Sequence, residues 1–364
     1  NIVEMYMLSE PEEVTSKLAN PSAMRAEEDP ALLTHLLSIM ATGGIRDRDA
    51  VTRFFAESFL ATHMEEQMLD SRLDDVIGWL TDNGMITRDG ESAEVLSRIK
   101  QREEVPEEPE EWQDEMPEWA RTTASVPGLE ISKSESPTPI GLTARKGPAI
   151  FGFAKASQRV TAEPILPDSA SMTYSATALG QRVARLYLNP ISGRMIHDGL
   201  QGAMRVMNGT DDVHQVSPLS LIHLVACTPD FLALWPRKDD IERIHAAIHS
   251  HQREFLSEPI DSDSERRMKG VLVLEDWINE SRMEDLEKNW SVQPGDVRSR
   301  VDLAEWLLFA MREILVDDDE LRRMDPIQHK ALIEFVGEIH RRVRHGCRAD
   351  LLGLVSIRGI GRTR

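Results

Sequence analysis

Two arginines and a tryptophan lie close together in a predicted helix that begins near Val297. Arg298 and Arg300 flank Ser299, and Trp306 follows about two turns later. At 100° per residue, Ser299 and Trp306 are nearly eclipsed, and Arg298 lies about 80° from Trp306. A guanidinium can contact phosphate while an indole stacks on a base, so this helix could hold a single nucleic-acid strand. The residues by themselves favour the alternative, in which Trp306 packs into a helical core and the arginines lie on the surface.

A second candidate binding segment lies at the basic end of the chain. From Val336 onward there are two acidic residues and seven arginines. A helix followed by Gly359-Ile360-Gly361, with Arg358 and Arg362 beside the glycines, is typical of the hairpin in a helix-hairpin-helix motif. Its glycines let backbone N–H groups approach a DNA phosphate. A glycine-capped helix with a basic tail explains the same residues equally well.

Motifs for catalysis or metal binding are absent from the sequence. No glycine is followed by lysine, which excludes a Walker-type phosphate-binding loop, and neither H-E-x-x-H nor G-x-S-x-G occurs. His245, His249 and His251 fall on one predicted helix, where a solvated face is a better interpretation than a metal site. Cys227 and Cys347 are too few for a disulfide framework or a cysteine-rich zinc site. We therefore predict no catalytic residue, metal or cofactor on this chain.

Charge is distributed unevenly along the 364 residues, which have 42 Lys+Arg and 62 Asp+Glu and a net charge of −20. Residues 1–150 carry −16 of it, and residues 151–364 carry −4. The negative net charge of the whole chain argues against a nucleic-acid partner. The arginine-rich C-terminal segment shows that one part of the chain could still bind nucleic acid. The densest acidic run, between Glu103 and Glu118, is interleaved with prolines. We interpret residues 101–170 as a poorly ordered insertion.

Apolar spacing predicts short helices over 30–40, 49–60 and 69–80, followed by a strand over 85–87. This order is typical of a winged-helix domain whose returning strand would be residues 173–177, although a small helical domain fits equally well. Beyond residue 180 the pattern is helical almost throughout. Asn189, Ser217, Asp296 and Asp325 are predicted helix caps. The fold class is therefore mainly α, with a helical bundle. The longest apolar stretches are too short to span a membrane, and two cysteines suit the cytoplasm.

Six runs of the sequence, taken in order, resemble the archaeal Hjm-type superfamily-two DNA helicases, relatives of HELQ and of the helicase part of polymerase theta. The runs cover nearly all of the chain outside 101–170. They are residues 10–18, 178–190, 221–229, 274–280, 294–296 with 304–306, and 344–348 leading into 359–362.

This resemblance implies a domain layout. Residues 1–24 would be a linker from two RecA-like motor domains that precede this chain, and residues 25–188 a winged helix containing the insertion. Residues 189–335 would be a helical ratchet domain. Residues 336–364 would be the start of a truncated helix-loop-helix (helix-hairpin-helix) domain. ATP and Mg would bind in the motor domains, so the chain would be part of an ATP-dependent enzyme without carrying its catalytic residues.

The resemblance also assigns the candidate binding residues. Trp306 matches the base-stacking tryptophan of the ratchet helix, while the arginine of that family falls on Ser299, so Arg298 or Arg300 would have to substitute. Arg358, Gly359, Gly361 and Arg362 would begin the hairpin's DNA contacts. The implied function is the DNA-gripping part of a 3′ to 5′ helicase that acts in replication-fork repair or recombination on single-stranded or forked DNA. The implied location is cytoplasmic and nucleoid-associated. The alternative is a non-enzymatic adaptor that binds protein partners.

Overall fold

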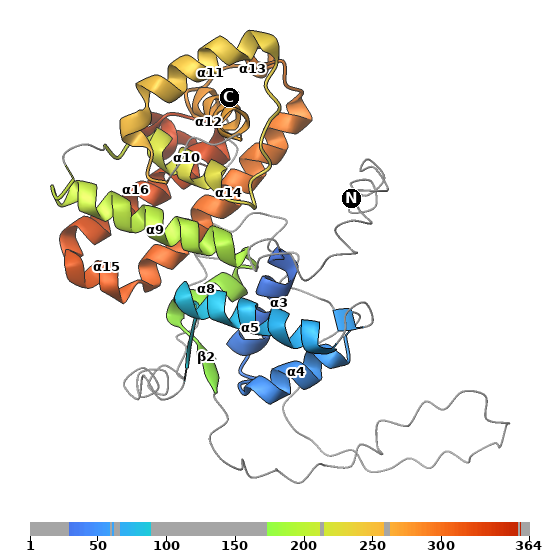
Figure 1. Ribbon diagram of the computed structural model, residues 1–364. Helices are drawn as coiled ribbons and strands as arrows, with labels where there is room; N and C mark the ends of the chain where they lie inside the picture. Colours follow the sequence, from blue (N-terminus) through green and yellow to red (C-terminus); the bar gives the residue numbers. More distant parts are fainter. Residues whose placement is uncertain are drawn as a thin grey trace, which may run out of the picture. The chain divides into compact units, whose positions relative to one another are not determined.

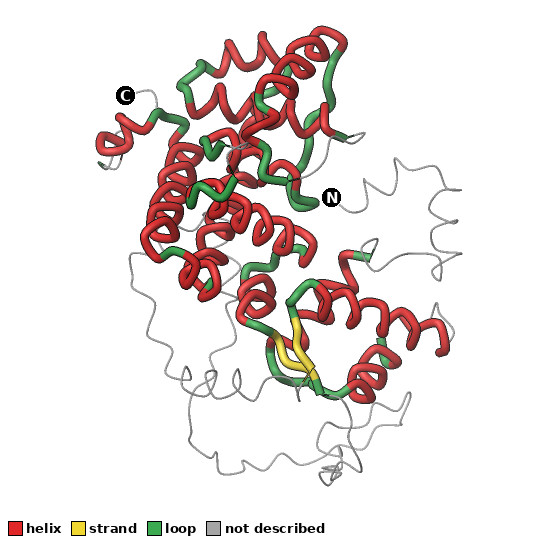
Figure 2. Tube along the Cα trace, turned by 60° about the vertical axis from the view of Figure 1, so that its left-hand side comes forward, coloured by secondary structure: helices red, strands yellow, loops and turns green. Residues whose placement is uncertain are grey.

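The computed structural model describes residues 29–58, 60–61, 66–88, 173–211, 215–257, 263–355 and 357. Within these residues the fold is mainly helical with two short strands (Figures 1 and 2), which confirms the prediction of a mainly α protein. The predicted linker, the insertion at 101–170 and the hairpin from Arg358 lie outside the described residues. No helix in the described part of the chain has the length and apolar character needed to cross a membrane.

The first described segment contains three helices, as the apolar spacing predicts. They are α3 (Pro30–Ala41), α4 (Arg48–Ala56) and α5 (Glu66–Asp82). Aspartates begin the first two, because the Asp29 carboxylate accepts the Leu32 N–H at 3.0 Å and the Asp47 carboxylate accepts the Ala50 N–H at 2.7 Å. The apolar side of α3 is fully buried in the core. Local capping and apolar periodicity therefore account for these helices.

A two-stranded antiparallel sheet closes this segment. Strand β1 (Ile86–Arg88) pairs with β2 (Tyr174–Ala176), with Ile86 opposite Ala176. The returning strand predicted at 173–177 is therefore confirmed. It pairs with β1 although residues 89–172 separate the two strands in the sequence. Helix α8 (Ala178–Arg185) follows at once, and Figure 1 shows it beside α3 and β2. Thr177 begins α8 by accepting the Gly180 N–H at 3.0 Å.

The rest of the described chain forms a helical bundle. Asn189, Ser217 and Asp325 cap α9, α10 and α16 as predicted. Helices α13 and α15 are not among the predicted helices, and Asp318 caps α15 by accepting the N–H groups of Glu320 and Leu321. The bundle helices are α9 (Pro190–Met207), α10 (Pro218–Cys227), α11 (Lys238–Ser250), α12 (Ser264–Ile278), α13 (Met283–Trp290), α14 (Pro294–Asp317), α15 (Asp319–Met324) and α16 (Pro326–His345), with short turns η6 (Gln252–Glu254), η7 (Ala349–Leu351) and α17 (Leu352–Val355).

Helix α14 lies at the centre of the bundle packing. Its most extensive contact is with α16, and it also touches α8, α9, α10 and α12. Helix α16 is tied to α12 as well, because the Trp277 indole N–H donates to the Val343 carbonyl at 2.7 Å. One hydrophobic core runs from α3 through α16 without interruption. The position of α14 is therefore fixed by several neighbours rather than by one.

Two bundle histidines are held neutral inside this core. Burial first, and nearby Arg344, Arg312 and Arg341 next, lower the pKa of His340 to about 3. Burial, with the charge of Arg267 second, lowers the pKa of His223 to about 4. The His223 ring stacks on Phe255 with ring centres 3.9 Å apart. Protonating either ring inside the core is unfavourable, because the charged form loses its hydration there.

Acidification is therefore expected to destabilise the protein through these two histidines. Their pKa values are lower in the folded than in the unfolded chain, so the unfolded chain binds more protons and stability falls as the pH drops below about 6.5. Each histidine should account for a loss of about 2 kcal/mol between pH 7 and pH 5. Denaturant melts of the wild type, His340→Gln and His223→Gln at both pH values measure this. Equal losses in all three proteins would contradict the assignment.

Candidate nucleic-acid interface

Helix α14 carries the residues whose spacing suggests strand binding. It begins at Pro294 with Gln293 as its cap, so the prediction that Asp296 is the cap is wrong. The Asp296 carboxylate instead lies three residues into the motif and accepts the Gln293 N–H at 3.1 Å, completing a capping box. One side of the helix is buried through Val297, Val301 and Ala304. The candidate residues lie around the rest of its N-terminal half.

Arg298, Asp302 and Trp306 follow one another at four-residue spacing along the open side of α14. The Arg298 side chain is 68% exposed, and its Nε lies 2.9 Å from an Asp302 carboxylate oxygen. Trp306 is half-buried and packs against the core, beside the partly buried Leu303 and the fully buried Leu307. The packing of Trp306 therefore agrees with the core alternative for part of the indole, and the rest of the side chain is exposed. A strand that binds here competes with Asp302 for the guanidinium.

The side chains of Ser299 and Arg300 form hydrogen bonds within the protein. The Ser299 hydroxyl donates to the Asp296 carbonyl at 3.0 Å and accepts from Arg300 Nη1 at 2.8 Å. Arg300 reaches across to the loop before α11, where Nε donates to the Leu232 carbonyl at 3.0 Å and Nη2 to the Ala233 carbonyl at 3.3 Å. Burial, opposed by the charge of Asp296, lowers the pKa of Arg300. Of the two arginines expected to substitute for the family's arginine, Arg298 is the more available to a ligand.

The basic end of the chain is less available than its composition suggests. Arg342 lies 3.9 Å from Glu338, Arg344 lies 3.6 Å from the buried Glu305, and Arg348 lies 3.8 Å from Glu280. These three arginines therefore neutralise acidic groups of the bundle. Arg358, Gly359, Gly361 and Arg362, the proposed hairpin contacts, lie outside the described residues.

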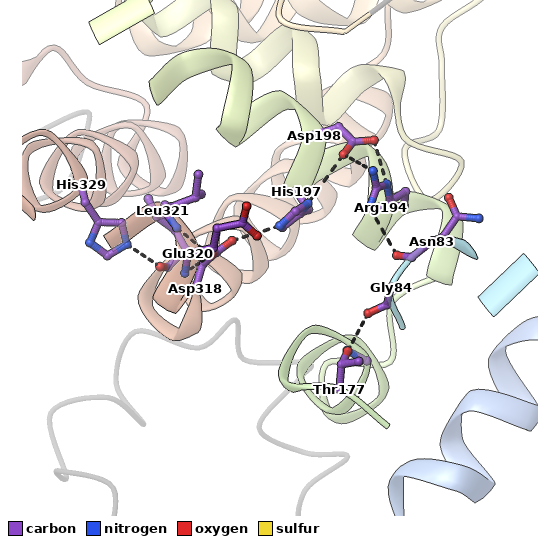
Figure 3. A network of polar contacts seen from close by, with 12 residues as sticks. Asn83, Gly84, Thr177, Arg194, His197, Asp198, Asp318, Glu320, Leu321 and His329 are labelled. Carbon is purple, nitrogen blue, oxygen red and sulfur yellow. Dashed lines mark hydrogen bonds and ion pairs between the residues drawn. The ribbon is translucent and has the colours of Figure 1, made fainter. Parts of the chain in front are cut away.

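A polar network fixes the C-terminal end of α14 (Figure 3). His197 of α9 lies 3.0 Å from an Asp318 carboxylate oxygen, and Arg182 of α8 is paired with Glu313, at 3.0 Å, and with Asp317. Burial opposes ionisation of Asp318, but hydrogen bonds from His197 and from backbone N–H groups outweigh it and lower the pKa of Asp318.

A cavity of about 350 Å³ is lined by Arg182, His197, Asp317 and Asp318 of this network. Gly84 and Thr177 border it on one side and Asp319 on the other. Arg194 joins the two segments of the fold, with Nη1 3.4 Å from the Asn83 carbonyl. The charged groups here hold elements together, which makes the cavity a structural junction.

Among the residues that the structure describes, no group of three or more His, Cys, Asp or Glu side chains is arranged to hold a metal ion. His245 is exposed and its Nε2 lies 2.6 Å from a Glu265 oxygen, while His251 ends α11 and contacts Glu254 at 2.7 Å. The prediction of a solvated histidine face is confirmed for His245 and His249, which are both exposed.

Sequence reasoning missed the loop between α10 and α11. Trp235 in this loop is 74% exposed, and the Arg266 guanidinium lies 3.9 Å from the centre of its ring. The available signal was the run Trp235-Pro236-Arg237-Lys238, in which an aromatic side chain is followed by two cations. This run indicates a binding site only if Trp235 is exposed, and residue spacing alone does not show whether it is.

Residues 219–346 match the family model described as archaeal helicase, domain 4. This segment runs from α10 to the end of α16 and includes all of α14. The bundle is therefore similar to a helical domain that is found in archaeal helicases.

Individual proteins with sequences similar to this chain are also archaeal helicases. The chain is 28% identical over 210 residues to the ATP-dependent DNA helicase Hel308 of Methanocella arvoryzae, a match that covers 56% of this chain and 26% of that protein. It is 29% identical over 193 residues to Hel308 of Pyrococcus horikoshii, covering 52% of this chain and 24% of that protein. The resemblance to archaeal superfamily-two helicases is thus confirmed. The chain matches only about a quarter of the length of these relatives.

Proposed function

We propose that this chain is the DNA-binding portion of an ATP-dependent 3′ to 5′ DNA helicase, and that α14 grips the translocating single strand. The observation that carries the proposal is α14 itself. It lies within the segment similar to archaeal helicase domain 4, and it carries the exposed Arg298 and the partly buried Trp306. Arg298 contacts a phosphate, and the accessible part of the Trp306 indole stacks on a base.

The proposed division of labour follows the expected layout. Residues 25–188 act as a winged helix, a role supported by the order of α3, α4 and α5 and by the pairing of β1 with β2. Residues 189–335 form the ratchet domain, and residues 336–364 begin a helix-hairpin-helix domain. RecA-like motor domains of the same polypeptide bind ATP and Mg. Between power strokes α14 resists backward slipping of the strand, on forked or single-stranded DNA during fork repair in the nucleoid.

Removing either group from α14 is expected to weaken single-strand binding by this chain. Trp306→Ala should reduce affinity several-fold or more, because stacking contributes about 1–3 kcal/mol per base. Arg298→Ala should reduce affinity and lower the slope of log affinity against log salt by about 1, because one phosphate contact is lost. Fluorescence anisotropy with a labelled oligothymidine at several salt concentrations measures both effects.

Two further variants serve as controls for this binding test. Asp302→Asn releases Arg298 from its partner and should bind at least as tightly as wild type. Trp306→Phe retains an aromatic face and most of the packing, so it separates lost stacking from lost stability, which thermal melts monitor. Unchanged affinity in both Arg298→Ala and Trp306→Ala would contradict the grip. Failure of the wild type to bind DNA, together with salt-independent binding of protein, would favour the adaptor alternative.

A further inference from the structure

Trp235 is exposed, although exposing a large apolar indole to water is unfavourable. The side chain is 74% exposed, and Leu232 in the same loop is 58% exposed. Large aromatic side chains usually bury most of their surface or meet a ligand. The Arg266 guanidinium covers one face of the indole at 3.9 Å from the ring centre, and Asp263 lies 3.1 Å from that guanidinium. The indole is thereby oriented without being buried.

The backbone under this loop is anchored by several separate contacts. Lys269, only 2% exposed, donates from Nζ to the Trp235 carbonyl at 3.0 Å and lies 2.7 Å from Asp240. Arg300 holds the Leu232 and Ala233 carbonyls from α14. The Leu234 N–H donates to the Arg266 carbonyl at 3.3 Å. Because these anchors fix the loop, a ligand that stacks on Trp235 meets a preorganised ring.

Cationic side chains lie against the Trp235 ring or shortly after it in the sequence. Arg237 and Lys238 directly follow the loop and are exposed at the start of α11, and Arg266 lies against the indole. An aromatic face among cationic side chains is complementary to a base and its flanking phosphates. An apolar protein surface would have to desolvate these same cations without partners. Single-stranded nucleic acid is therefore the occupant that matches both the ring and the charges.

We propose that Trp235, Arg266, Arg237 and Lys238 form a second base-stacking site for single-stranded DNA, which we call the Trp235 platform. A base stacks on the indole face that Arg266 leaves open, and Arg237 and Lys238 contact adjacent phosphates. Arg300 couples the platform to α14, two residues from Arg298. The inference rests on the proposed function in one respect, that the chain binds single strands.

The test uses the full 364-residue chain and a labelled oligothymidine. Trp235→Ala is expected to weaken binding about fivefold or more, with little change in the salt slope. Lys238→Ala is expected to lower the salt slope by about 1. Trp235→Phe should restore much of the affinity. Photocrosslinking to an oligonucleotide containing 5-iodouracil, mapped by mass spectrometry, should place a crosslink on the peptide that contains Trp235.

The control variant is Ile327→Ala, which removes another highly exposed apolar side chain, from α16, and should bind as wild type does. Because Trp235 is exposed, its replacement should leave the melting temperature nearly unchanged. Wild-type binding that persists unaltered in Trp235→Ala, with no crosslink at that peptide, would overturn the platform while leaving the α14 grip intact. Absence of binding by the wild type would overturn the proposed function and the platform together.

Discussion

Gly180→Ala is expected to lower the free energy of unfolding by about 3 kcal/mol, at the upper end of the usual cost of overpacking. A Cβ on Gly180 would lie 2.0 Å from the Met85 carbonyl oxygen and 2.9 Å from the Met85 carbonyl carbon. These are backbone atoms, and the same carbonyl accepts the Thr177 N–H at 3.0 Å. The clash can be relieved only if α8 moves away from the end of β1, which would disturb the junction between the sheet and α8.

Gly78→Ala is the matched control for this substitution. Gly78 lies inside α5, and a Cβ there would have no atom within 4 Å. Alanine favours the helix over glycine, so this variant should gain about 0.5–1 kcal/mol. Urea unfolding of the two variants beside wild type measures the difference. A Gly180→Ala protein as stable as Gly78→Ala would show that α8 does not approach Met85 this closely.

The helices could be predicted because their signals are local. Asn189-Pro190, Ser217-Pro218 and Asp325-Pro326 each combine a capping side chain with a proline in the first turn, and each begins a helix. The pairing of β1 with β2 was also predictable, because a short strand after three helices requires a partner and residues 173–177 supply the next strand pattern. The short helices α13 and α15 were missed because each is too brief for apolar periodicity to register.

The sequence could not predict which side chains of the candidate site are available to a ligand, because availability depends on their partners and not on their spacing. Helical geometry places Arg298 near Trp306, but it does not indicate that Arg300 binds the carbonyls of residues 232 and 233. Composition likewise suggested a free basic end, whereas Arg344 pairs with Glu305 on α14. Whether a cation is available to a ligand depends on acids and carbonyls that are distant in the sequence. Such pairings become visible only when the helices are packed.

Lys269 illustrates the same point and leads to the largest expected effect in the bundle. A lysine within a helical pattern is expected at the surface, yet Lys269 is 2% exposed and its Nζ lies 2.7 Å from the equally buried Asp240. Lys269→Met is expected to cost about 3–5 kcal/mol, because Asp240 would remain buried without its counter-charge. The Trp235 carbonyl would also lose its donor.

Two comparisons separate the loss of the pair from the loss of a lysine. Adding Asp240→Asn to Lys269→Met removes the buried charge and should recover more than half of the lost stability. Lys330→Met, at an exposed i,i+4 pair with Glu334 at 3.9 Å, should change stability by no more than about 0.5 kcal/mol. Hydrogen exchange should increase in the 232–236 loop of Lys269→Met, because an anchor of that loop is gone. Equal stability of Lys269→Met and Lys330→Met would mean that Lys269 does not hold the loop. The inference that the backbone beneath the Trp235 platform is rigidly anchored would then be contradicted as well.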